Sequence, residues 1–213
     1  MTAMPQASGK GLVGYFGYGS LVNRATLRTD YVDIVPARLI GYRRSWRPRP
    51  DMPGFPAALL TVRPDADVIC DGVLVVDRAE NLAAVDAREA RYIRRAIDRT
   101  QVESPGGVPD GLPLYVYTAD EELPPHVEPP RILRSYLDAV MQGFLALHGE
   151  DGLRRFIAET ENFDIPVHED RDRPTYPRAV SLTPAEVDLF DRLLAERGGM
   201  RFPGSINRHQ GLE

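Results

Sequence analysis

Apolar residues recur along this chain with two different spacings, and the change from one to the other falls near residue 120. Before that point the apolar residues form short runs or alternate with polar ones, as they do in β-strands. After it they recur at every third or fourth position, as they do on one face of an α-helix. The predicted strands are residues 13–17, 31–39, 41–47, 57–63, 68–76, 92–102 and 114–118. This order predicts an α+β fold, with a small β-barrel followed by helices.

The second half of the chain predicts three helices. They cover residues 131–148, 151–160 and 184–198, with Gly149 as the stop signal of the first. A capping box of Thr183 and Glu186 begins the third helix. We therefore expect a disordered N-terminus at 1–11, a domain at 12–120, a helical extension packed on it at 121–199 and a flexible tail at 200–213. The apolar faces of the extension either cover the barrel or form a homodimer interface.

Composition narrows the class of protein. The chain has 213 residues, of which 43% are hydrophobic and 27% charged, as in an ordinary globular domain. Its net charge of -5 argues against nucleic acid as a partner. No apolar run approaches the roughly 18 residues of a membrane span, and the first ten residues lack the apolar core of a secretory signal. Since Cys70 is the single cysteine, no intrachain disulfide is possible, and we expect a cytoplasmic protein with no membrane partner.

The sequence predicts neither a metal nor a cofactor. One cysteine cannot anchor a thiolate site, and the histidines are not paired at the spacing of metal ligands. The histidines are His126, His148, His168 and His209. The chain also lacks a phosphate-binding Gly-Lys-Ser/Thr loop and a complete dinucleotide fingerprint.

The first candidate site lies where the first predicted strand ends, at Tyr18, Gly19, Ser20 and Leu21. Glycine permits unusual dihedral angles and a close approach of a ligand to the backbone. Successive exposed N–H groups in such a turn form a concavity that suits a carboxylate or an oxyanion. The alternative is a glycine-rich strand end without a ligand, and the turn by itself favours neither interpretation.

The second candidate site is Glu89, at the end of a short helix that we expect to begin with Asp77 as its N-cap. At about 100° per residue, Glu89 lies on the same face as the apolar Leu82 and Val85. A carboxylate on an apolar face is costly unless it is paired, hydrogen-bonded or protonated. A buried carboxyl group also suits the work of a general base. The alternatives are an ion pair with Arg88, Arg91 or another arginine, or a helix end that exposes the side chain.

These two sites and several other segments resemble motifs of the γ-glutamylcyclotransferase superfamily, including its glutathione-directed, ChaC-type branch and plant AIG2-like relatives. The turn at Tyr18–Leu21 resembles the Tyr-Gly-Ser-Leu signature of that family. Residues 85–92 resemble its Leu-Asp-x-Arg-Glu-Gly-x-Tyr segment, with Val85 and Ala90 in place of the usual leucine and glycine. Further similar segments are residues 38–44, 72–74 and 114–117. The resemblance covers residues 12–120.

The resemblance implies a γ-glutamylcyclotransferase-like small β-barrel with flanking helices. Glu89 matches the catalytic glutamate of the family, and the turn at Tyr18–Leu21 matches the loop that grips the γ-glutamyl unit. Tyr117 matches a tyrosine that lines the pocket. The implied reaction converts a γ-glutamyl amine, dipeptide or glutathione into 5-oxoproline and a free amine or peptide, with Glu89 as general acid and base. It needs no cofactor.

Two alternatives stay open beside this hypothesis. One is another enzyme on the same scaffold, which acts on a γ-glutamyl amine or an amino-acid amide rather than on glutathione. The other is a non-catalytic module for small-ligand binding or assembly, although a binder gains little from a carboxylate on an apolar face. The arginine-rich segment at 170–178 resembles a C-terminal segment of longer, plant-like members of the family, and the resemblance assigns it no role.

Overall fold

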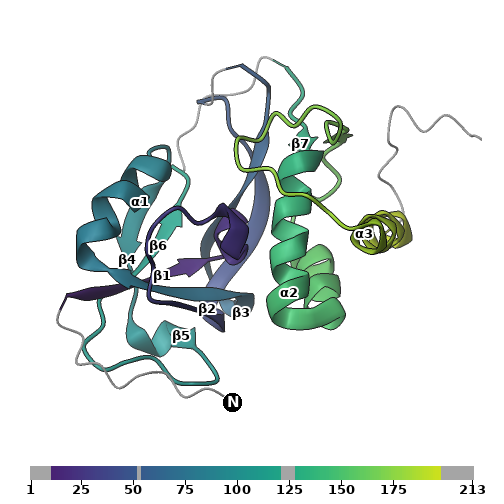
Figure 1. The fold of residues 1–213 in the computed structure, drawn as a ribbon. Coiled ribbons are helices and arrows are strands. Elements are labelled where there is room, and N and C mark those ends of the chain that lie inside the picture. Colours follow the sequence, from purple (N-terminus) through teal and green to yellow (C-terminus); the bar gives the residue numbers. More distant parts are fainter. Residues whose placement is uncertain (1–10, 52–53, 121–127, 198–213) are drawn as a thin grey trace, which may run out of the picture.

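The structure is a computed structural model that describes residues 11–51, 54–120 and 128–197 (Figure 1). The segments expected to be a disordered N-terminus and a flexible tail lie outside the described residues, apart from Gly11. The α+β fold is confirmed. A curled sheet lies between α1 on one side and α2 with α3 on the other (Figure 1). In the described part of the chain, no helix is both long enough and apolar enough to cross a membrane.

Six strands form the main sheet, in the order β4-β6-β1-β3-β2-β5. The strands are β1 (Leu12–Gly17), β2 (Asp33–Pro48), β3 (Ala58–Arg78), β4 (Ile93–Ala96), β5 (Val102–Glu103) and β6 (Leu114–Thr118). β1 pairs antiparallel with β3 and parallel with β6. Because β1 is central, the turn that follows Gly17 emerges from the middle of the sheet. Val73 to Val76 in β3 are buried, as expected for a continuous apolar run that is covered on both faces.

Two predicted strand breaks are wrong. From residue 33 on, the predicted strands at 31–39 and 41–47 belong to the single strand β2, and from residue 58 on those at 57–63 and 68–76 belong to β3. The register between β2 and β3 shifts at Gly41, whose φ of 78° is accessible mainly to glycine. A β-bulge of this kind bends a strand pair without ending it.

The predicted strand at 92–102 is also wrong. β4 ends at Ala96, and a 3-10 helix, η4 (Arg99–Gln101), leads into β5 at the other edge of the sheet. The Asp98 side chain ends the strand, since its Oδ1 accepts a hydrogen bond of 2.8 Å from the Thr100 backbone. Local bonds of this type compete with strand pairing.

Asp77 is not a helix N-cap, contrary to the prediction. It is a buried residue of β3 that accepts hydrogen bonds from the Tyr15 hydroxyl at 2.9 Å and the Thr29 hydroxyl at 2.7 Å. A 3-10 helix, η3 (Ala79–Asn81), precedes α1 (Leu82–Arg88). The helix is therefore shorter than the pattern predicted, and Glu89 lies at its C-terminal end.

The helices of the second half follow the predicted order. α2 (Arg134–Glu159) contains a kink at Gly149, whose φ is 68°, so it consists of the two predicted helices. α3 (Pro184–Glu196) begins with the predicted capping box of Thr183 and Glu186. The start of the first helix differs, because β7 (Ile132–Leu133) pairs with β8 (Val167–His168). The predicted end of the third helix, at residue 198, lies outside the described residues.

Helix α2 packs directly against the segment that follows β1. The Asn23 side chain donates a hydrogen bond of 2.8 Å to the Ala139 carbonyl oxygen. Gly143 allows the close approach, since a Cβ atom there would lie 2.7 Å from the Val22 side chain. Val22 ends η1 (Ser20–Val22), the 3-10 helix that contains part of the candidate turn. Residues from the extension therefore lie beside the first candidate site.

Candidate active site

The turn after β1 is shaped by contacts that require a glycine. A Cβ atom at Gly19 would lie 2.9 Å from the Tyr136 hydroxyl oxygen and 3.5 Å from Leu60 Cβ. Gly19 is the N-cap of η1, so the N–H groups of Ser20 and Leu21 lie at the start of a helical turn. N–H groups in this position have no acceptor within the turn and are suited to bind an anion.

Glu89 lies at the C-cap of α1, and its backbone N–H donates a hydrogen bond of 2.9 Å to the Val85 carbonyl oxygen. Its side chain is 15% exposed, and Val85 beside it is buried. The carboxylate forms an ion pair with Arg88, with 2.9 Å between Glu89 Oε1 and Arg88 Nε. The ion pair that the sequence left open is therefore present. It offsets part of the cost of placing a charge against apolar side chains.

Arg88 also connects the carboxylate to the turn. Its guanidinium donates a hydrogen bond of 3.2 Å to Ser20 Oγ and one of 2.7 Å to the Thr26 carbonyl oxygen. The Arg88 side chain is only 9% exposed. Sequence reasoning did not select Arg88 as a site residue, although it directly precedes Glu89 in the motif. Its contacts fix the distance between the two predicted halves of the site.

Tyr117 joins β6 to both the turn and the helix. Its hydroxyl donates a hydrogen bond of 2.7 Å to Asp86 Oδ1 in α1. Its carbonyl oxygen accepts a hydrogen bond of 2.5 Å from the Tyr18 hydroxyl. Burial and the bond to Asp86 raise the pKa of Tyr117. The Tyr117 ring lines the pocket, as predicted, but its hydroxyl is committed to holding α1 in place.

All of the predicted site residues line one narrow inner cavity of about 30 Å³. Its lining consists of Tyr18, Gly19, Ser20, Leu21, Leu60, Glu89, Tyr92, Tyr117 and Tyr136. Sequence reasoning missed Tyr92 and Tyr136 as wall residues. Tyr92 is the last position of the Glu89 motif, so the motif contained a signal for it. Tyr136 comes from α2, and no local pattern connects it to the turn.

A larger outer chamber, of about 420 Å³, begins at the same residues. It shares Ser20, Glu89, Tyr92 and Tyr136 with the inner cavity and extends to residues 175–178. Among the described residues that line the two cavities, Glu89 is the one carboxylate. A proton acceptor therefore lies at the junction between a narrow recess and a space of ordinary ligand size.

The phenols around the recess are neutral donors. Burial raises the pKa values of Tyr18 and Tyr136 well above that of a free tyrosine, and it also raises the pKa of Tyr92. The Tyr92 hydroxyl donates a hydrogen bond of 2.9 Å to the Leu60 carbonyl oxygen. The Arg49 guanidinium lies 4.4 Å from the centre of the Tyr92 ring. These tyrosines therefore stay protonated near neutral pH and do not act as bases.

Comparison with known proteins extends the picture at the level of the fold. No protein-family model and no curated protein matches the chain. A solved structure described as "Gamma-glutamyl cyclotransferase" matches 85% of this chain and 99% of its own, with a TM-score of 0.54 and 16% identity. An uncharacterized protein from Homo sapiens matches the same shares, with a TM-score of 0.53 and 15% identity. The γ-glutamyl cyclotransferase fold implied by the sequence motifs is thus confirmed.

Proposed function

We propose that this protein is a γ-glutamylcyclotransferase-type enzyme. It converts a γ-glutamyl amine, dipeptide or glutathione into 5-oxoproline and the free amine or peptide. The main support is the position of Glu89, which lines both the recess and the outer chamber and shares the recess with the turn at Tyr18–Leu21. The shared fold and the sequence motifs support the same reaction.

The reaction needs a proton acceptor, because the α-amino group of the substrate is largely protonated at neutral pH and then is not a nucleophile. Glu89 accepts a proton from this group, and the free amine attacks the side-chain carbonyl carbon. A bond forms between the nitrogen and this carbon, and the bond from the carbon to the leaving nitrogen breaks. The attacking nitrogen loses two protons in all, the leaving nitrogen gains two, and Glu89 returns to its carboxylate form.

The two halves of the cavity take different parts of the substrate. The backbone N–H groups of Ser20 and Leu21 bind the α-carboxylate or the developing oxyanion. The leaving group lies in the outer chamber, whose volume is that of an ordinary ligand site. Since the inner cavity holds only about 30 Å³, the γ-glutamyl unit widens it on binding. Folding the substrate against the turn also brings its amine toward its own carbonyl.

The proposal is tested by incubating the purified protein with glutathione, γ-glutamyl-alanine and γ-glutamyl-ε-lysine and measuring 5-oxoproline by mass spectrometry. We expect product from at least one of them. Replacing Glu89 by Gln should lower kcat by about 10²–10⁴-fold, the usual contribution of general acid–base catalysis. Glu80→Gln is the matched control, since Glu80 is exposed and lies in η3 on the same helical segment. Near-normal turnover by the Glu89→Gln variant would refute the assignment of the base.

A further inference from the structure

The outer chamber has two walls, and one of them lies outside the motifs at residues 12–120. One side consists of residues 87–91, at the end of α1, and the other consists of residues 175–178, in the irregular segment before α3. Apolar and aromatic side chains cover most of the remaining surface. They are Phe55, Ala57, Leu59, Tyr92, Leu133 and Tyr136. A ligand in this chamber therefore meets a largely apolar surface.

The charges in the chamber are unbalanced. Its lining contains the cations Arg88, Arg91 and Arg178 and the single carboxylate Glu89. Arg88 is paired with Glu89, and Arg91 lies 3.9 Å from the Asp51 carboxylate. In the described ranges, the half-buried Arg178 has no carboxylate within ion-pair distance. Among the described residues, Arg178 is therefore the lining cation without a carboxylate partner, in the same chamber as the carboxylate that we assign to proton transfer.

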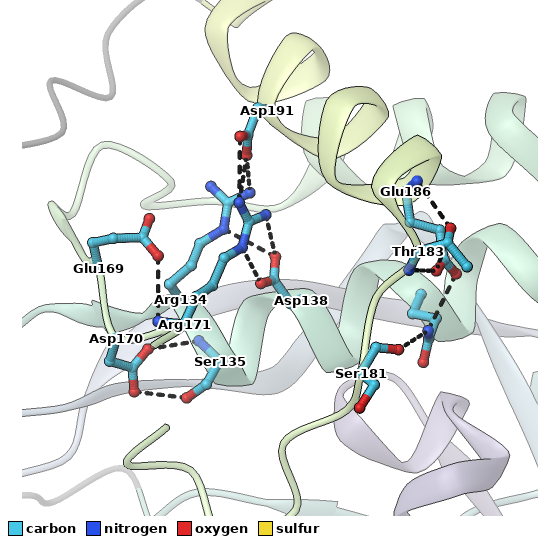
Figure 2. A network of polar contacts seen from close by, with 11 residues as sticks. Arg134, Ser135, Asp138, Glu169, Asp170, Arg171, Ser181, Thr183, Glu186 and Asp191 are labelled. Atoms are coloured by element: carbon cyan, nitrogen blue, oxygen red, sulfur yellow. Dashed lines mark hydrogen bonds and ion pairs between the residues drawn. The ribbon is translucent and has the colours of Figure 1, made fainter. Parts of the chain in front are cut away.

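The segment that carries Arg178 is held in place by buried polar contacts. The Asp170 carboxylate accepts hydrogen bonds of 2.7 Å from both the backbone N–H and the hydroxyl of Ser135, at the start of α2 (Figure 2). It also accepts one of 2.8 Å from the Thr175 backbone N–H. The Tyr176 ring packs edge-on against Tyr136, with 5.0 Å between ring centres. Arg178 therefore extends from an anchored backbone.

A second network fixes the same segment from the other side. Arg171 forms an ion pair of 2.6 Å with Asp138, a residue of α2 that also pairs with the fully buried Arg134 at 2.9 Å (Figure 2). Both arginines contact Asp191 in α3. The segment is thus attached to two helices before it reaches the chamber. Such attachment is needed if a residue is to discriminate between ligands by position.

We propose that Arg178 is a specificity-determining residue that selects leaving groups bearing a carboxylate. This inference rests on the proposed function and names its substrate class. The leaving amine carries an apolar or aromatic body, which lies on the chamber wall, and a negatively charged end, which pairs with the Arg178 guanidinium. Amines with a neutral or cationic end lack that partner and bind less well.

The inference is tested with two substrates that differ by one carboxylate, γ-glutamyl-phenylalanine and γ-glutamyl-phenethylamine. We expect kcat/KM to be higher for the first by about tenfold or more, mainly through KM, since charge-assisted hydrogen bonds are the stronger ones. The Arg178→Gln variant should lose this preference and keep its activity on the phenethylamine substrate. Arg178→Lys, which retains the positive charge, should keep part of the preference for the carboxylate substrate.

Arg173→Gln is the matched control, because Arg173 is an exposed arginine of the same segment that does not line the chamber. It should keep the full preference for the carboxylate. Equal use of the two substrates by the unmodified protein, or an equal loss on both in Arg178→Gln, would overturn the role of Arg178 and leave the proposed function intact. Formation of 5-oxoproline from no substrate at all would overturn both proposals.

Discussion

The recess and the outer chamber meet at Glu89, yet they are built in different ways. Most of the residues that line the recess come from two short motifs, at residues 18–21 and 85–92, and Leu60, Tyr117 and Tyr136 complete it. The chamber owes its far wall to residues 175–178, whose position depends on contacts to α2 and α3. Under the proposed function, the reacting groups therefore come from local motifs, and the space for the leaving group depends on long-range attachment.

The largest expected effect on stability comes from removing the anchor of the far wall. Asp170→Ala leaves the Ser135 and Thr175 donors without their acceptor, so we expect the free energy of unfolding to fall by about 3 kcal/mol. Urea denaturation measures this change. Asp172→Ala, at an exposed position of the same segment, is the control and should shift the free energy by less than about 0.5 kcal/mol.

The Asp170→Ala variant also separates the two regions by their function. With the wall loosened, turnover of γ-glutamyl-phenylalanine should fall more than turnover of γ-glutamyl-alanine, whose leaving group is small. Equal losses on the two substrates would show that the wall does not act on the leaving group.

The next effect concerns the recess. Gly19→Ala places a methyl group 2.9 Å from the Tyr136 hydroxyl oxygen. Overpacking of this kind lowers the free energy of unfolding by about 1–3 kcal/mol. We expect KM to rise for every γ-glutamyl substrate by a similar factor, because the turn binds the part that they share. Steady-state kinetics on the alanine and phenylalanine substrates checks this expectation.

A double variant sharpens the test. Tyr136→Phe removes the oxygen that the new methyl group would meet. Gly19→Ala should therefore lower the free energy of unfolding less in the Tyr136→Phe background than in the unmodified protein. If the cost were the same in both backgrounds, the contact with Tyr136 would not explain the requirement for glycine.

The smallest effect is expected at Tyr117. Tyr117→Phe removes the hydrogen bond to Asp86, which should lower the free energy of unfolding by about 1 kcal/mol. The ring remains in the wall of the recess, so KM should change little. Thermal unfolding and steady-state kinetics on one substrate measure both quantities. A large rise in KM would mean that the hydroxyl binds the substrate rather than the helix.

Much of the site was predictable because its signals are local. The turn at 18–21 and the wheel position of Glu89 need only a few neighbouring residues, and the structure brings them together around one cavity. The Arg88 ion pair was one of the stated alternatives. The wall residues Tyr136 and Tyr176 were not predictable, because nothing in the helical spacing of α2 or in an irregular segment specifies what it packs against.

The errors in the fold have a similar cause. The pattern of residues 92–102 suits a strand, but the side chain of Asp98 provides a competing local bond that ends it. Gly41 and the polar residues near 65 suggest strand ends. In the structure, pairing between β2 and β3 continues on both sides of these positions, so neither strand ends there. The domain boundaries and the homodimer stay predictions.

The pairing of β1 with β6 has a consequence for folding during synthesis. The Tyr18 hydroxyl finds its acceptor 99 residues further along the chain, at Tyr117, and Gly19 lies against Tyr136. Contacts between such distant residues form late in folding, because a long loop has to close first. During synthesis on the ribosome, the turn at Tyr18–Leu21 emerges early, but its contacts with Tyr117 and Tyr136 cannot form until those residues have left the exit tunnel. Under the proposed function, enzymatic activity should therefore be absent until residues 136 and 175–178 have all been released.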